Sequence, residues 1–211
     1  MQSHPPAMFI ADSLGLDFIN SIATPVDTPV DWIGDGDGLL RWLAQAQLVP
    51  PDVLDEIKAH ATPGELDDVA GQARDLREWF RGFVREHMGR PLAPRALKEL
   101  EPLNRLLESD QAFSKIVAHR HRDGDDGHDG FALERTRRWR SAETLLLPIG
   151  ETMARVVCEE SFSDIKACEG PACTLMFADH TRARARRWCS MAICGNRAKQ
   201  AAHRSRMKER G

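Results

Sequence analysis

Four cysteines near the C-terminus have the number and spacing of a metal site. Cys168 and Cys173 form one pair and Cys189 and Cys194 another, with four residues inside each pair and fifteen between the pairs. Zinc prefers four soft ligands in a tetrahedron, and two thiolate pairs supply them. Two disulfides are the alternative, typical of secreted proteins, but the sequence shows no export signal and Cys158 is expected to be an ordinary buried thiol. We therefore expect one structural Zn²⁺ ion.

The residues around these pairs suit a small module that zinc holds together. Gly170 and Pro171 supply a turn inside the first pair. Ser190 is a good N-cap and predicts a helix that starts in the second pair and runs to about Met207. With a short hairpin between the pairs, this order is the treble-clef plan. About 50 residues bury too small a core alone, whereas structural zinc contributes roughly 10–16 kcal/mol. Zinc removal should unfold this module and leave the rest folded.

Charged residues are distributed unevenly along the chain. It has 29 Lys and Arg against 32 Asp and Glu, yet residues 179–211 hold ten basic and two acidic residues, which puts +8 on this segment and −11 on the rest. Such asymmetry is typical of an acidic body with a tail that binds polyanions, although a solvated tail without a partner would give the same count. Nine cations are candidate nucleic-acid contacts: Arg182, Arg184, Arg186, Arg187, Arg197, Lys199, Arg204, Arg206 and Lys208.

Four further polar residues are candidates for supporting roles. Asp179 and Asn196 are candidates to hydrogen-bond the cysteine sulfurs or to cap the turn beside them. Asp17 and Asn20 lie three residues apart on one face of an expected helix, and they are the best candidates before residue 160 to present polar groups to a small-molecule ligand. A helix cap or a buried structural hydrogen bond is the alternative for this second pair.

Most of the chain before Cys158 is expected to be helical. Apolar residues recur with helical spacing in 76–84 and 139–156, and Pro148 predicts a kink in the second of these helices. Shorter helices are expected over residues 11–22, 39–47, 51–60 and 94–109. Alternating residues in 113–121 and 131–135 predict a β-hairpin, whose acidic turn lacks the ligand spacing of an EF-hand.

These patterns predict a mainly α fold in two domains. Residues 1–160 would form a helical domain with a small β-hairpin, and residues 161–211 a treble-clef-like zinc finger with a basic C-terminal helix. The boundary is placed near Ser161, where aromatic residues thin out and cysteine and arginine concentrate.

Two stretches of the sequence resemble known families. Residues 187–191 (RWCSM), followed by 194–197 (CGNR), are similar to the CGNR zinc finger, whose spacing all four cysteines match and whose pattern also includes Phe177, Asp179 and Arg186. Residues 14–20 (LGLDFIN) resemble the opening of the ABATE domain, described as a stress-induced transcription regulator. Together the resemblances imply a bacterial transcription regulator in which the helical domain is a sensor and the finger binds DNA.

The leading hypothesis is therefore a zinc-dependent, DNA-binding transcription regulator. A zinc-held module that binds RNA or a protein partner is the alternative, because a fold does not fix a function. Enzymatic activity is not expected, since four thiolates fill the coordination sphere that a catalytic zinc leaves open, and a nuclease built on His180 is the least favoured reading. Without a stretch that could span a membrane, we expect a cytoplasmic protein without a membrane partner. An unidentified small-molecule effector and a two-fold homodimer are further expectations.

Overall fold

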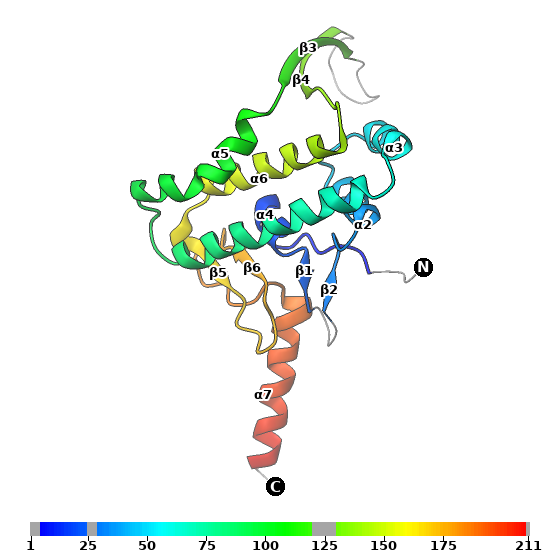
Figure 1. Ribbon diagram of the computed structural model, residues 1–211. Coiled ribbons are helices and arrows are strands. Elements are labelled where there is room, and N and C mark those ends of the chain that lie inside the picture. The colour runs from blue at the N-terminus through cyan, green and yellow to red at the C-terminus, as the bar shows by residue number, and fades with distance from the viewer. Residues whose placement is uncertain (1–4, 25–28, 120–129, 210–211) are drawn as a thin grey trace.

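The computed structural model describes residues 5–24, 29–119 and 130–209. Figure 1 shows that this part of the chain is mainly helical, as predicted. The α-helices are α1 (Leu14–Ile19), α2 (Gly36–Gln45), α3 (Pro51–His60), α4 (Glu65–His87), α5 (Glu101–Glu108), α6 (Leu146–Glu159) and α7 (Asn196–Glu209). A π-helical turn, η4 (Met191–Gly195), precedes α7. Among the described residues, no helix is both long and apolar enough to cross a membrane.

The strands form three small antiparallel sheets of two strands each within the described residues. The pairs are β1 (Ile22–Ala23) with β2 (Val30–Asp31), β3 (Ala112–His119) with β4 (Gly130–Arg137), and β5 (Ile165–Ala167) with β6 (Met176–Ala178). Each pair is a local addition to the helices, because none of the three sheets joins another. The fold is therefore organised by its helices.

Helix α1 lies at the centre of the helical body, which comprises the elements from α1 to α6. It packs against α4 and α6 and also contacts strand β6 (Figure 1). Its approach to α6 depends on Gly15, because a Cβ atom there would lie 2.5 Å from the Thr152 carbonyl oxygen and 2.6 Å from Val156 Cγ2. Leu16 and Phe18 are fully buried on the same helix. This short helix consequently has neighbours from the middle and the end of the chain.

The sequence predicted the positions of the helices better than their ends. Helix α3 spans the predicted residues, but α1 is shorter than 11–22, and 94–109 divides into a 3-10 stretch (Pro94–Leu100) and α5. Pro148 does not kink a long helix, because α6 begins at Leu146 and the proline occupies its first turn, where a backbone donor is not needed. The prediction that Cys158 is buried is wrong, since it lies exposed near the end of α6.

The predicted β-hairpin is present and stands away from the helices. Strands β3 and β4 pair from Ala112 opposite Arg137 to His119 opposite Gly130. Figure 1 places this hairpin at the opposite end of the molecule from α7. The acidic turn and the last two residues of the predicted strand 113–121 lie outside the described residues. The β3–β4 hairpin and helix α7, which both project from the rest of the fold, are therefore far apart.

The C-terminal segment shares the core of the body. Met176 and Phe177 on β6 are buried in the same cluster as the residues of α1, α4 and α6. The Ala178 amide donates a hydrogen bond to the Ala11 carbonyl at 2.9 Å, and the Gly89 amide donates one to the Phe162 carbonyl at 2.7 Å. The division into residues 1–160 and 161–211 stays a prediction, and the packing crosses it.

Candidate metal centre and the basic segment around it

The four predicted zinc ligands come together at one end of the β5–β6 hairpin. Cys168 follows β5 directly and its amide donates to the Leu175 carbonyl at 2.9 Å, so the first cysteine pair lies on the turn of this hairpin. Cys189 ends the following loop, and Cys194 lies in η4. The four sulfurs, including that of Cys173, all lie within 4.8 Å of one another. The β5–β6 hairpin thus carries the first cysteine pair on its turn. The prediction that a hairpin lies between the two cysteine pairs is wrong.

The cluster has the dimensions of a tetrahedral zinc site. The Sγ atoms of Cys173 and Cys189 are 3.8 Å apart, and those of Cys189 and Cys194 are 3.5 Å apart. Zn–S bonds of about 2.3 Å put the corners of a tetrahedron about 3.8 Å from one another. Three of the cysteines are buried and Cys173 is half-buried. The residues therefore fit a closed, structural zinc ion with four thiolate ligands.

Backbone amides support the sulfur of Cys168. The Gly170 amide donates to this sulfur at 3.4 Å, and the Cys189 amide donates to it at 3.2 Å. A Cβ atom at position 170 would lie 3.0 Å from the Cys194 sulfur, so a side chain there would press into the cluster. N–H donors of this kind stabilise the negative charge of a thiolate ligand and fix its direction.

The thiols cannot all ionise in this packing without a cation. The hydrogen bond with Cys189 lowers the pKa of Cys173 to about 5, while the same contact raises the pKa of Cys189 far above its usual range. Burial raises the pKa of Cys194 to about 12. The protein alone therefore favours a thiolate at Cys173 beside protonated thiols at Cys189 and Cys194. A zinc ion, when bound, would supply the positive charge that lets all four cysteines ionise and would crosslink the two pairs.

A capped turn connects the cysteine cluster with helix α7. The Ser190 hydroxyl oxygen accepts a hydrogen bond from the Ala192 amide at 3.1 Å, which confirms the predicted N-cap. Turn η4 follows, and α7 continues to Glu209, close to the predicted end. In Figure 1, α7 points away from the body. The cysteine cluster therefore holds the root of a protruding helix.

Asp179 organises the loop that leads to the second cysteine pair. Its buried carboxylate accepts hydrogen bonds from the Lys166 ammonium group at 2.7 Å, from the Thr181 amide at 3.0 Å and from the Arg186 amide at 2.9 Å. Burial raises the pKa of Asp179, but these donors outweigh it and hold the pKa well below its usual range. Of its two predicted roles the structure shows the turn cap, and within the described residues its partners do not include a cysteine sulfur.

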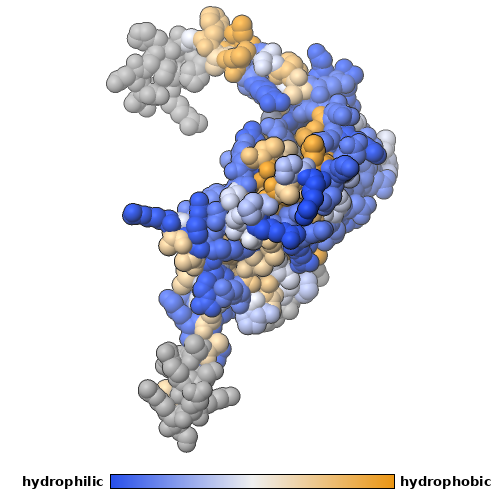
Figure 2. All heavy atoms as spheres, turned by 90° about the vertical axis from the view of Figure 1, so that its left-hand side faces the viewer, coloured by the Kyte–Doolittle hydropathy of each residue, from blue (hydrophilic) through white to orange (hydrophobic). Residues whose placement is uncertain are grey.

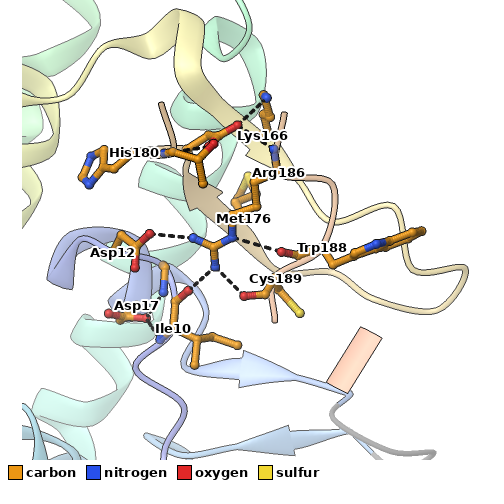
Figure 3. A network of polar contacts seen from close by, with 12 residues as sticks. Ile10, Asp12, Asp17, Lys166, Met176, His180, Arg186, Trp188 and Cys189 are labelled. Atoms are coloured by element: carbon orange, nitrogen blue, oxygen red, sulfur yellow. Dashed lines mark hydrogen bonds and ion pairs between the residues drawn. The ribbon is translucent and has the colours of Figure 1, made fainter. Parts of the chain in front are cut away.

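Arg186 ties this loop to the N-terminal segment of the chain. Its guanidinium group donates to the Asp12 carboxylate at 2.6 Å and to the Ile10 carbonyl at 2.7 Å. It also donates to the carbonyl of Trp188 at 3.0 Å and to that of Cys189. Figure 3 shows the guanidinium group at the centre of these four partners. The structure gives Arg186 an internal role, because its guanidinium group bonds four partners inside the protein and its side chain is only 18% exposed. Its predicted contact with nucleic acid stays a prediction that this geometry disfavours.

Asp17 and Asn20 hold backbone segments together. The Asp17 carboxylate is buried and accepts hydrogen bonds from the amides of Ile10 at 2.9 Å and Ala11 at 3.0 Å. The Asn20 side chain is buried too, and it donates to the Met176 carbonyl at 2.7 Å and accepts from the Met176 amide at 3.0 Å. Burial raises the pKa of Asp17 to about 6. The alternative for these residues, a buried structural hydrogen bond, is confirmed. It leaves their role in ligand binding as a prediction without support from these contacts.

Two further arginines of the loop bond to acidic neighbours. Arg187 contacts the Glu169 carboxylate at 2.6 Å. Arg184 lies 3.4 Å from the Asp164 carboxylate and donates to the Asp179 carbonyl. Both side chains keep about half of their surface in solvent, at 62% for Arg187 and 48% for Arg184. A phosphate group would therefore have to compete with these ion pairs.

The other candidates of the basic segment face solvent where the structure describes their side chains. The exposed residues are Arg182, Asn196, Arg197, Lys199 and Arg204. Asn196 is the first residue of α7, and a hydrogen bond from its side chain to a cysteine sulfur is not among the contacts of the described residues. The side chains of Arg206 and Lys208 lie outside the described residues. Three of these exposed cations, Arg197, Lys199 and Arg204, thus lie on α7.

Two family models match the sequence. The ABATE model, described as "Putative stress-induced transcription regulator", matches residues 12–160, which is more than half of the chain. The chain belongs to the ABATE family. The CGNR zinc finger model matches residues 165–207 of this ABATE protein and includes all four clustered cysteines. Both resemblances inferred from the sequence are confirmed, while no curated protein matches the chain.

Sequence reasoning missed the partners of Arg186 in this ABATE protein. Asp12 and Ile10 precede it by 174 and 176 residues, so no rule of local spacing connects them. The arginine also lies over the Phe177 ring, with 4.2 Å between its Cζ atom and the ring centroid. Covarying positions in related sequences are the signal that would have indicated this pairing.

Proposed function

We propose that the protein is a zinc-dependent transcription regulator that binds DNA through helix α7. The observation that carries this proposal is a protruding 14-residue helix whose root is held by the cysteine cluster and whose Lys199 and Arg204 are exposed. A helix of this length is about 21 Å long, and the major groove of B-DNA admits an α-helix. The regulator description of the family supports the same function.

The distribution of charge supports a polyanionic partner. Residues 179–211 carry +8, whereas the rest of the chain carries −11. The guanidinium group of Arg186 bonds to groups of the protein itself. Among the residues that the structure describes, the cations best placed to contact phosphate groups are therefore Arg182, Lys199 and Arg204. Each phosphate that a cation neutralises releases counterions, so the logarithm of the binding constant falls by about 0.9 per phosphate for each unit of log salt.

Binding titrations at several salt concentrations test the proposal. Fluorescence anisotropy would follow labelled duplex DNA and RNA of random sequence with the zinc-loaded wild type, with Lys199→Ala/Arg204→Ala, and with Arg41→Ala/Lys98→Ala. The last variant removes the same charge from exposed positions of the body. We expect the α7 variant to bind DNA more weakly and to lose about 1.8 from its salt slope, while the body variant behaves as the wild type.

Three results would count against DNA binding through α7. Equal, weak binding to duplex DNA and RNA would indicate a nonspecific polycation. Tighter binding to RNA would favour the alternative of an RNA-binding module. An unchanged salt slope in Lys199→Ala/Arg204→Ala would remove α7 from the interface. If DNA binding is confirmed, selection from a random pool of duplexes would then give the recognised sequence.

Nuclease activity is not part of the proposal. His180 Nε2 lies 2.7 Å from the Glu160 carboxylate, and the neighbouring Asp179 carboxylate is occupied by donors of Lys166, Thr181 and Arg186. Neither side chain is thus placed to activate a water molecule together with the other. Metal-dependent cleavage of plasmid DNA that disappears in His180→Ala would overturn this view.

A small-molecule effector stays a prediction without an assigned site. Asp17 and Asn20, the residues first assigned to that site, are occupied by backbone partners. A ligand that binds only the folded protein raises its melting temperature. A thermal-shift screen of metabolites is therefore the measurement that decides whether an effector exists.

A further inference from the structure

One face of the β3–β4 hairpin is apolar and uncovered. Ile116, Phe131 and Leu133 expose 73%, 85% and 74% of their surface. Ile116 is directly opposite Leu133, and Phe131 is opposite Ala118 two residues further along, so all four side chains share one face. Figure 2 shows hydrophobic residues gathered on this hairpin at the top of the molecule. Single exposed apolar residues are ordinary, but a contiguous group of this kind marks an interaction surface.

The rest of the chain ties down only the base of the hairpin. Arg137 near the end of β4 contacts the carboxylates of Asp110 at 3.2 Å and Glu151 at 2.9 Å. On the opposite face, the Arg138 guanidinium group lies 5.0 Å from the centroid of the Phe113 ring, which is only 38% exposed. The body thus anchors the base of the hairpin, and Arg138 directly after β4 lies over Phe113 on one face, whereas the apolar face is left to solvent.

A hairpin built in this way needs a partner for its apolar face. A two-stranded hairpin is at best marginally stable in water, and it gains stability when a hydrophobic face is packed. The long edges of β3 and β4 are also open, because each strand pairs only with the other within the described residues. An exposed apolar strand pair without a partner would be an aggregation hazard, which natural proteins avoid.

We propose that this face binds the same face of a second copy of the chain, which makes the protein a two-fold homodimer. The Ile116–Leu133 pair and its neighbours Ala118 and Phe131 carry no charge, so the face is complementary to itself when a two-fold axis brings two copies together. Arg135 and Ser114, the next pair on this face toward the base, supply a polar rim. A lipid surface fits less well, because Trp and Lys are missing from these positions.

The exposed area is sufficient for a dimer of modest stability. The three large side chains together leave on the order of 400 Å² of apolar surface in solvent on each copy. Two copies would therefore bury about 800 Å² from these side chains alone, and the strand edges and the rim would bring the total to about 1,000 Å², the lower end of specific interfaces. We accordingly expect a dimer that dissociates on dilution.

Sedimentation velocity and light scattering over a range of concentrations test this proposal on the full-length, zinc-loaded protein. The wild type should change from monomer to dimer as its concentration rises through the micromolar range. Ile116→Glu/Leu133→Glu should weaken the dimer at least about a hundredfold, because the interface would bury like charges. Leu97→Glu, which replaces an apolar residue of 64% exposure on the body, is the matched control and should dimerise as the wild type does.

Two additional variants separate a lost interface from a misfolded hairpin. Ile116→Thr/Leu133→Thr places β-branched residues of high strand propensity in both strands and should still weaken the dimer. Ile116→Lys/Leu133→Lys should be monomeric alone but should form a heterodimer with Ile116→Glu/Leu133→Glu. A wild type that stays monomeric, a double-Glu variant that still dimerises, a Leu97→Glu variant that dissociates, or Lys and Glu variants that fail to pair would each overturn the proposal.

Discussion

Basic side chains of two neighbouring regions have different environments. The clamped arginines, which are Arg184, Arg186 and Arg187 in the loop before the second cysteine pair, all contact acidic side chains or carbonyl groups of the protein. The helix cations Lys199 and Arg204 on α7 lie exposed beyond the cysteine cluster. The same type of charge thus assembles the metal centre on one side of the cluster and is available to a partner on the other.

This difference shows what a local excess of positive charge does and does not predict. Arg186 lies between Arg184 and Arg187 in a segment that carries +8, yet it is only 18% exposed. A guanidinium group has five donors and suits carbonyl and carboxylate acceptors within a protein as well as phosphate groups outside it. Composition therefore indicates a polyanion-binding segment, whereas the acceptors nearby decide which arginines take part.

The largest expected effect concerns the cysteine cluster, which lies between the clamped arginines and the helix cations. Removal of zinc with a strong chelator should unfold residues 165–195 and also lower the melting temperature of the helical body, because β6 is part of the core around α1. This expectation replaces the sequence-based one, in which the body stays folded. Circular dichroism at a helical wavelength during heating, with and without chelator, measures the effect.

Restoration by added zinc is the control for that experiment. A body that melts at an unchanged temperature after zinc has been removed would show that the two regions are energetically separate. In that case the shared packing would carry little free energy.

The next effect distinguishes a clamped arginine from a helix cation. Arg186→Ala removes the guanidinium donors of Asp12 and of three carbonyl groups, which should lower the free energy of unfolding by about 3 to 4 kcal/mol. Arg204→Ala should change it by less than about 0.5 kcal/mol. Urea unfolding of the zinc-loaded proteins compares the two variants, and equal effects would break the distinction between the groups.

Asp17, which holds the N-terminal segment that Arg186 also contacts, should make the stability of the protein depend on pH. Its pKa of about 6 in the folded chain lies above the usual aspartate value of 3.8, so the folded protein binds more protons between these values. The stability contributed by this group is therefore full below about pH 4 and falls as the pH rises to about 6, by at most about 3 kcal/mol.

Asp17→Asn should remove this part of the pH dependence. The amide oxygen can still accept hydrogen bonds from Ile10 and Ala11, while the titrating group is gone. Urea midpoints of both proteins across this pH range give the difference, in which the acid sensitivity of the thiolates cancels. Parallel curves for the two proteins would contradict the assignment.

The smallest effect concerns a second link between the body and the cysteine segment. Asn20→Ala leaves the Met176 amide and carbonyl without partners in the core and should lower the free energy of unfolding by about 2 kcal/mol. Asn196→Ala, at an exposed position, should be close to neutral. Denaturation of the two variants side by side is the test, and a neutral Asn20→Ala would mean that water replaces the lost contacts.

The metal centre could be predicted from the spacing of local residues. Its contacts with the helical body could not, because the contacting residues are far apart in the chain. The cysteine pairs, the Ser190 cap and the alternation in β3 and β4 are local patterns, and each was confirmed by the structure. The Asn20–Met176 contact joins residues 156 positions apart, and a single sequence contains no signal for it. For the same reason Asp17 and Asn20 were assigned to a ligand, because a buried polar residue on an apolar helix looks the same whether its partner is a metabolite or a distant strand.

The position of β6 against α1 has a consequence for the order in which the protein folds. Helix α1 ends at Ile19, but the strand that completes its surroundings begins at Met176. During synthesis, nearly the whole chain must therefore be made before β6 can pack against the first helix. Contacts between such distant residues slow folding. A chain truncated before β6 would expose part of its central core, so we expect that folding of the body is completed only when the cysteine segment arrives.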